Sequence, residues 1–304
     1  MKAKTIRKIL KGKFALLLKS IEDEPVKKLV EKNTIITGGS IVSLLLNEQV
    51  NDFDLYFKDK ETTKAVAEYY VKKFKRDNPP NTFKSGRVVD LSVREDGDRI
   101  KIIAKSSGVA SESQDQDYQY FESLDPGDPQ TEEFIESAMQ VAKSDEKARK
   151  GEYKPIFLTT NAITLSSSIQ LIIRFYGEPE EIHKNYDFVH CTNYWTSWDD
   201  KLVLRKEALE AILTKELVYV GSLYPLCSII RTRKFLKNGW TINAGQYLKM
   251  AMQLNELNLL DPKVLEDQLI GVDVAYFYEL ISRLKRGEKE IDSIYICQLV
   301  DEIF

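Results

Sequence analysis

Apolar positions near the start of the chain change their spacing several times, and each change predicts a new element. Residues 5–32 place apolar side chains at helical spacing, and residues 34–37 form a β-branched run, "TIIT". Residues 41–45 return to helical spacing. Residues 52–57, "DFDLYF", then alternate strictly between polar and apolar positions. The opening therefore predicts helices, a short strand, a strand-to-helix turn and a second strand with one apolar face.

The middle of the chain mixes helical and strand patterns. Residues 106–131 are rich in Ser, Asp, Gln, Gly and Pro, which predicts a mobile surface insertion. Residues 131–150 read as a polar helix. Around these segments the pattern predicts a helix over 61–77, a hairpin over 86–105, strand character over 155–165 and 169–175, and a short strand over 186–191.

Beyond about residue 196 the apolar spacing is helical to the end of the chain, for example over 199–217 and 222–239. We therefore expect an α+β chain in two parts. A mixed α/β domain spans residues 1–195, and an all-α domain spans residues 196–304.

Composition and charge narrow the class of protein. The 304 residues are 43% apolar and 30% charged, and no apolar run approaches the roughly 20 residues that span a bilayer. The basic start has too short an apolar core for a signal peptide, so we expect a cytoplasmic protein without a membrane partner. Lysine and arginine are concentrated in the first 30 residues and over 201–237. The net charge of −3 therefore does not exclude nucleic-acid binding, which depends on local basic patches.

The metal-binding residue types point to a hard cation. Three scattered cysteines and two histidines give neither a disulfide framework nor a zinc spacing. Any metal should therefore be an oxygen-bound ion such as Mg²⁺.

Gly38, Gly39 and Ser40 fall at a strand-to-helix turn, where backbone N–H groups can approach phosphate. Asp52 and Asp54 share one strand face, where their carboxylates can share divalent ions.

The segments "ITGGS" and "SLLLNEQVNDFDL" together resemble the signature of the nucleotidyltransferase superfamily that includes DNA polymerase β. They are most similar to tRNA nucleotidyltransferases (CCA-adding enzymes) and bacterial poly(A) polymerases. The resemblance implies the nucleotidyltransferase fold, a nucleoside triphosphate substrate and two Mg²⁺ ions. It assigns the metal ions to Asp52 and Asp54, and the β- and γ-phosphates to Gly38, Gly39 and Ser40.

The same resemblance calls for a third carboxylate on a neighbouring strand. Asp187 in "YDFVHC" is the first choice, because this layout is similar to phage nucleotidyltransferase-like proteins; Asp90 in "RVVDLSV" is the alternative. The segment 224–242 is similar to the helix that follows the catalytic domain in CCA-adding enzymes. It offers three cations to a triphosphate or an acceptor backbone: Arg231, Arg233 and Lys234.

The resemblance is weaker where base choice is set. Val42 and Ser43 stand where family members carry Arg-Asp, and "FLTTNA" lacks the family's Arg-Arg-Asp run. We expect transfer to an RNA 3′ end, tRNA in particular. The alternatives are a protein or small-molecule acceptor, or a retired enzyme that binds nucleotide or nucleic acid. The phage-like segments suggest a viral origin.

Overall fold

The computed structural model describes residues 1–77, 89–106, 153–159 and 161–261, together with residues 264, 265, 268 and 294. These residues fall into two compact units. The described residues up to 182 and residues 193–204 form the first unit, and residues 183–192 and 205 onward form the second. The predicted insertion at 106–131 and the predicted helix at 131–150 lie outside the described residues, apart from Ser106 at the end of a strand.

The first unit is built on a seven-stranded mixed sheet with the strand order β5-β6-β7-β2-β1-β8-β9. Its strands are β1 (Thr34–Thr37), β2 (Phe53–Phe57), β5 (Pro155–Leu158), β6 (Ala162–Leu165), β7 (Ile169–Tyr176), β8 (Tyr194–Thr196) and β9 (Lys201–Val203). The central strand β2 pairs antiparallel with β1 and parallel with β7. A separate two-stranded sheet joins β3 (Val89–Asp96) to β4 (Arg99–Ser106).

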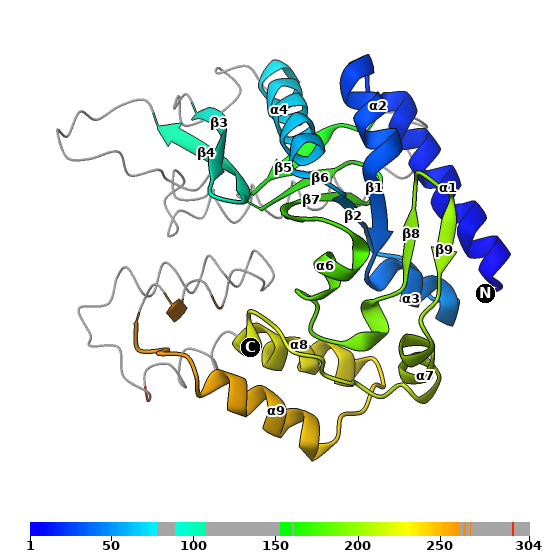
Figure 1. Ribbon diagram of the computed structural model, residues 1–304, viewed down its shortest axis with the longest axis vertical. Coiled ribbons are helices and arrows are strands. Elements are labelled where there is room, and N and C mark those ends of the chain that lie inside the picture. Colours follow the sequence, from blue (N-terminus) through cyan, green and yellow to red (C-terminus); the bar gives the residue numbers. More distant parts are fainter. Residues whose placement is uncertain are drawn as a thin grey trace. The chain divides into compact units, whose positions relative to one another are not determined.

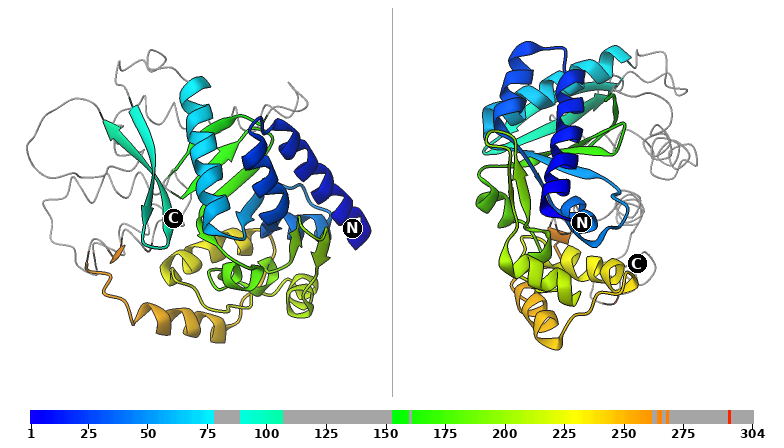
Figure 2. Two further views of the ribbon diagram at one scale, coloured as in Figure 1. Left: turned by 45° about the horizontal axis from the view of Figure 1, so that its top comes forward. Right: turned by 90° about the vertical axis from the view of Figure 1, so that its right-hand side faces the viewer.

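Helices cover one face of the sheet. They are α1 (Ala3–Ser20), α2 (Glu24–Asn33) and α4 (Lys60–Asp77), which lie side by side in front of the strands in the left view of Figure 2. Phe14 of α1 packs on Trp195 of β8, with ring centroids 5.3 Å apart. On the covered face Leu55 and Phe57 are fully buried, and this apolar layer is the core of the first unit.

Local sequence explains where these elements begin and end. Asp23 caps α2, because its carboxylate accepts the Val26 N–H at 3.1 Å, and Pro25 occupies the first turn. The short helix α3 (Gly39–Leu46) follows β1 and ends at Asn47, whose φ of 61° closes the helix. The helix α6 (Pro179–His183) follows β7.

The second unit is helical. It contains the 3₁₀ turn η3 (Val189–Cys191) and the helices α7 (Lys206–Thr214), α8 (Pro225–Lys237) and α9 (Ala244–Leu254). Helix α8 packs against α9, coloured yellow and orange in Figure 1, and α7 packs against η3. His190, Phe235 and Trp240 form an aromatic cluster in this unit.

The predicted α+β class is confirmed for the described residues, and three local predictions are wrong. Residues 186–191 form a single bridge at Phe188 and then η3, not a strand. The helix predicted from residue 199 begins only at Lys206, because Lys201–Val203 pairs with β8 as strand β9. The strand character over 155–165 belongs to two strands, β5 and β6, that pair as a hairpin. The predicted domain boundary at residue 195 stays a prediction.

Candidate active site

The turn between β1 and α3 has a backbone conformation that requires glycine. Gly38 has φ 91° and ψ −152°, outside the regions open to residues with a side chain. It caps α3, and Gly39 and Ser40 are the first two residues of the helix. A Cβ at Gly39 would meet no atom within 4 Å, so its surroundings are open. Gly39 is also exposed, so an anion can approach the N-terminus of α3 at this residue.

Strand register brings the aspartate pair beside this turn. Thr37, the last residue of β1, is paired with Asp54 of β2, so the chain enters the glycine turn next to Asp54. Asp54 is half-buried, whereas Asp52 is exposed and lies one residue before β2 begins. The two carboxylates are two residues apart and belong to the same side of the extended chain. The sequence-predicted glycines and aspartates therefore converge at one end of the sheet.

Ser40, in the first turn of α3, adds a buried hydroxyl group to this turn. Its side chain is 2% exposed, and its Oγ has no hydrogen-bond partner among the described residues. A buried hydroxyl without a partner costs about 1–3 kcal/mol, so such groups are usually satisfied by water, an ion or a ligand. A phosphate oxygen at the N-terminus of α3 would satisfy it.

The same row of the sheet carries two polar residues that the motif did not indicate. Tyr194 of β8 is paired with Thr37, and Gln170 of β7 is paired with Asp54. Both side chains are half-buried. The one available signal for Gln170 was its place as a single polar residue inside the apolar run "IQLII".

Neither candidate for the third carboxylate lies on a strand that is hydrogen-bonded to β2. Asp90 is on β3, in the separate two-stranded sheet, where its backbone is paired with Lys105. The neighbours of β2 are β1 and β7, whose sequences contain no acidic residue. Within the described part of the chain, no group of three or more His, Cys, Asp or Glu side chains could hold a metal ion. The prediction that Asp187 or Asp90 lies on a strand next to β2 is therefore wrong for both residues.

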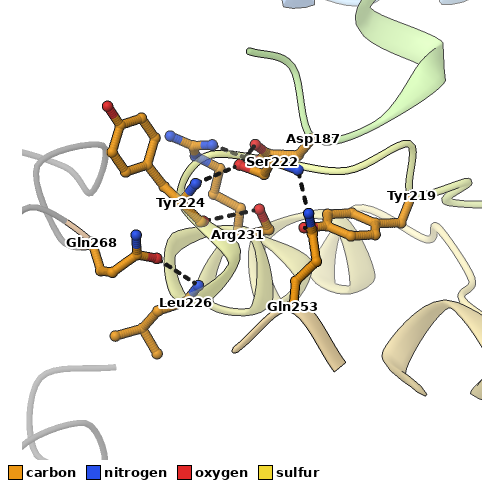
Figure 3. A network of polar contacts seen from close by, with 9 residues as sticks. Asp187, Tyr219, Ser222, Tyr224, Leu226, Arg231, Gln253 and Gln268 are labelled. Carbon is orange, nitrogen blue, oxygen red and sulfur yellow. Dashed lines mark hydrogen bonds and ion pairs between the residues drawn. The ribbon is translucent and has the colours of Figure 1, made fainter. Parts of the chain in front are cut away.

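Asp187 belongs to the second unit, where it is bound by other side chains. It is 6% exposed and accepts hydrogen bonds from Ser222 Oγ at 3.0 Å and from Arg231 (Figure 3). Ser222 Oγ in turn accepts the Tyr224 N–H at 2.9 Å, just before α8 begins. This ion pair ties residue 187 to the start and the middle of α8. Within the second unit these contacts hold the Asp187 carboxylate in place.

The three cations predicted on α8 differ in their surroundings. Arg231 is partly buried in the ion pair with Asp187. Arg233 and Lys234 are exposed, and neither forms an ion pair with any described residue. Two of the three predicted cations are therefore available to an anionic ligand of the second unit.

The fold and this turn define a class: an α+β protein in which a glycine–serine turn and a helix N-terminus adjoin a strand bearing an aspartate pair. The particular family follows from comparison with known proteins. Residues 8–215 match the family described as Gad2, Gabija anti-defense 2 family protein, and the chain belongs to this family. None of the described helices is long and apolar enough to cross a membrane.

Other comparisons add little. No curated protein matches the sequence. Among solved structures, the chain is similar to the Thermotoga maritima CCA-adding enzyme complexed with tRNA, with 12% sequence identity and a TM-score of 0.38. The match covers 90% of this chain and 53% of that one, so the chain spans about half the length of that enzyme. At this level of similarity, neither activity nor ligands follow.

Proposed function

We propose that this Gad2 protein is a Mg²⁺-dependent nucleotidyltransferase, which moves a nucleoside monophosphate from a nucleoside triphosphate to an acceptor hydroxyl. One observation carries the proposal: the pairing of Thr37 with Asp54 sets the glycine turn and the aspartate strand side by side. Phosphate-binding and metal-binding groups must be adjacent in such an enzyme, because the triphosphate is bound together with its metal ions.

Each residue of the turn and strand has a role in this proposal. The N-terminus of α3 binds the β- and γ-phosphates, and Ser40 Oγ donates a hydrogen bond to a phosphate oxygen. Gly38 supplies the turn, and Gly39 lets the backbone approach the phosphate. Asp52 and Asp54 hold two magnesium ions, because carboxylate oxygens are ligands that suit Mg²⁺. When bound, the ions would neutralise phosphate charge and lower the pKa of the acceptor hydroxyl.

The remaining assignments rest on the resemblance of the sequence to nucleotidyltransferases. Asp187 stays the first proposal for the third carboxylate and Asp90 the alternative, although Asp187 already pairs with Arg231. The resemblance assigns Arg231, Arg233 and Lys234 to a phosphate of the nucleotide or of the acceptor; among them, Arg231 already pairs with Asp187. Transfer then depends mainly on positioning and electrostatic stabilisation by these groups.

RNA is the acceptor that the charge distribution favours, with a tRNA 3′ end as the first choice. Residues 1–21 contain no acidic side chain, and Lys4, Lys8 and Lys19 are exposed on α1. With Arg233 and Lys234 on α8, they give both units exposed positive charge.

A protein of the Gabija defence system is the second candidate acceptor, and the family description favours it. Transfer of a nucleotide to a defence protein would add a phosphate charge and a base to its surface, which can block a binding or catalytic site. An anti-defense role sets either reaction in the cytoplasm of an infected bacterium.

The test uses the purified chain, Mg²⁺ and each α-labelled nucleoside triphosphate, with total cellular RNA and, separately, the Gabija proteins. We expect Asp52→Asn and Asp54→Asn to reduce label transfer to background, with circular dichroism unchanged. Asp98→Asn is the matched control, because Asp98 is an exposed aspartate of the first unit in the β3–β4 turn. Full activity of either active-site variant would overturn the proposal.

The labelled product identifies the acceptor. Label in tRNA-sized RNA supports the first candidate, and label on a Gabija protein supports the second. Label on a small molecule keeps the reaction and removes both acceptors. The absence of label from all of these would favour a protein that binds nucleotide or nucleic acid without turnover.

A further inference from the structure

Gln170 is a polar residue inside the apolar segment "IQLII" at the start of β7. Its neighbours on β7, Ile169 and Leu171, are each 1% exposed and point into the helix-covered core. Side chains alternate along a strand, so Gln170 points to the opposite face of the sheet. A glutamine has no packing advantage at this central position, where β-branched residues are preferred. Its presence therefore calls for a polar partner.

The partner is not found within the described residues. Gln170 is half-buried, yet its side-chain amide forms no hydrogen bond with any residue that the structure describes. Leaving the donor and the acceptor of a partly buried amide unpaired costs free energy. A ligand on this face of the sheet would remove that cost.

Register places this amide beside Asp54. Gln170 and Asp54 are paired residues on the parallel strands β7 and β2. Paired residues on adjacent strands point to the same face, and the strands lie about 4.8 Å apart. Two oxygen atoms on such neighbouring side chains can reach one divalent ion. Thr37 flanks Asp54 on the other side, but its hydroxyl already donates to the Asn193 carbonyl at 2.9 Å.

We propose that the side-chain amide oxygen of Gln170 is a ligand of the divalent ion held by Asp54, an assignment that rests on the proposed nucleotidyltransferase function. A glutamine carbonyl is an accepted oxygen ligand for hard cations. It supplies a third oxygen ligand where β1 and β7 offer no acidic side chain.

The experiment measures Mn²⁺ binding to the full chain by electron paramagnetic resonance, with Mn²⁺ as the only added ligand. Gln170→Leu keeps the side-chain size and removes the amide, and we expect its Mn²⁺ affinity to fall at least about tenfold. Gln170→Glu adds a carboxylate beside Asp54, so its affinity should rise. Thr164→Val is the matched control: Thr164 is paired with Gln170 one strand further from Asp54, and its affinity should equal that of the wild type.

The outcomes separate this inference from the proposed function. Loss of Mn²⁺ binding in Asp54→Asn, with unchanged affinity in both Gln170 variants, overturns the role of Gln170 and leaves the proposed function intact. No Mn²⁺ binding by the wild type, or equal binding by Asp54→Asn, overturns both. A purely structural role for Gln170 would lower the melting temperature of Gln170→Leu without producing tighter binding in Gln170→Glu.

Discussion

Gly38 and Gly39 are adjacent in the sequence, but the structure makes different demands at the two positions. Gly38 has φ 91°, a backbone conformation that strains any residue with a Cβ. Gly39 lies in α3, and a Cβ there would meet no atom within 4 Å. Of these two positions, only position 38 therefore requires glycine for the backbone conformation. A glycine at position 39 needs a different reason, and close approach of a phosphate supplies one.

Alanine substitutions separate these two reasons. We expect Gly38→Ala to destabilise the chain by about 1–3 kcal/mol because of its backbone strain. Gly39→Ala should stabilise the chain by up to about 1 kcal/mol, since alanine is the better helix residue and has room. Urea unfolding measures both effects.

ATP binding then tests the function of Gly39. If a phosphate approaches the backbone closely at Gly39, the added methyl group of Gly39→Ala should weaken ATP binding, although this variant is more stable than the wild type. Equal ATP affinity in the two proteins would remove Gly39 from the proposed phosphate site.

At the scale of elements, Asp200 joins α1 to the β8–β9 hairpin. Its carboxylate accepts hydrogen bonds from Arg7 at 2.9 Å, Lys11 at 2.7 Å and the Trp195 indole N–H at 3.0 Å. The hydrogen bond from Arg7, with smaller contributions from Lys11 and Trp195, holds the pKa of Asp200 well below its usual range. The carboxylate therefore stays charged, and the contact persists, in mildly acidic solution.

Removal of this carboxylate should loosen α1. We expect Asp200→Ala to lower the free energy of unfolding by about 1 kcal/mol, a modest effect because the ion pairs are largely exposed. Lys8→Ala is the control, since Lys8 is exposed on the same helix and forms no ion pair with a described residue. Urea unfolding of both variants measures the difference, and equal stability would show that the hairpin contact does not hold α1.

Sequence patterns identified most elements but not the pairing partners of the short ones. Lys201–Val203 has too few residues for a strand pattern, and it is a strand because β8 lies beside it. The alternation in "YDFVHC" is typical of a strand, yet Phe188 forms only an isolated bridge, with Tyr219. In both cases the neighbouring segment decides the conformation, and a local pattern does not contain that neighbour.

At the scale of the whole molecule, both histidines of the chain are buried in the second unit. Burial lowers the pKa of His190 to about 4, and its ring lies 4.3 Å from that of Trp240. Burial, with a smaller contribution from the positive charge of Arg205, lowers the pKa of His183 to about 3. Both residues are therefore neutral in the folded chain at neutral pH.

These shifts predict a loss of stability in mild acid. The unfolded chain binds protons at these histidines below about pH 6.5, whereas the folded chain does not until pH 4 or lower. Their contribution to stability is thus complete above pH 6.5 and is lost as the pH falls toward 4. For His190 alone, the free energy of unfolding should fall by about 2 kcal/mol between pH 7 and pH 5.

Urea unfolding of the wild type and of His190→Phe at pH 7 and pH 5 tests this expectation. The variant keeps an aromatic ring in the cluster and removes one titrating group, so its stability should fall less between the two pH values. An equal fall in the two proteins would show that His190 does not titrate in this way.

The sequence by itself determined the α+β class and the local elements of the candidate site. Short-range spacing contains that information: two glycines after a β-branched run, and two aspartates separated by one residue. Only the tertiary structure decided which residues surround Asp54. Strand register pairs Asp54 with Thr37 and Gln170, and an ion pair in the second unit binds Asp187 to Arg231. These contacts join residues far apart in the chain, and they depend on the packing of the whole sheet and of α8, which no local pattern records.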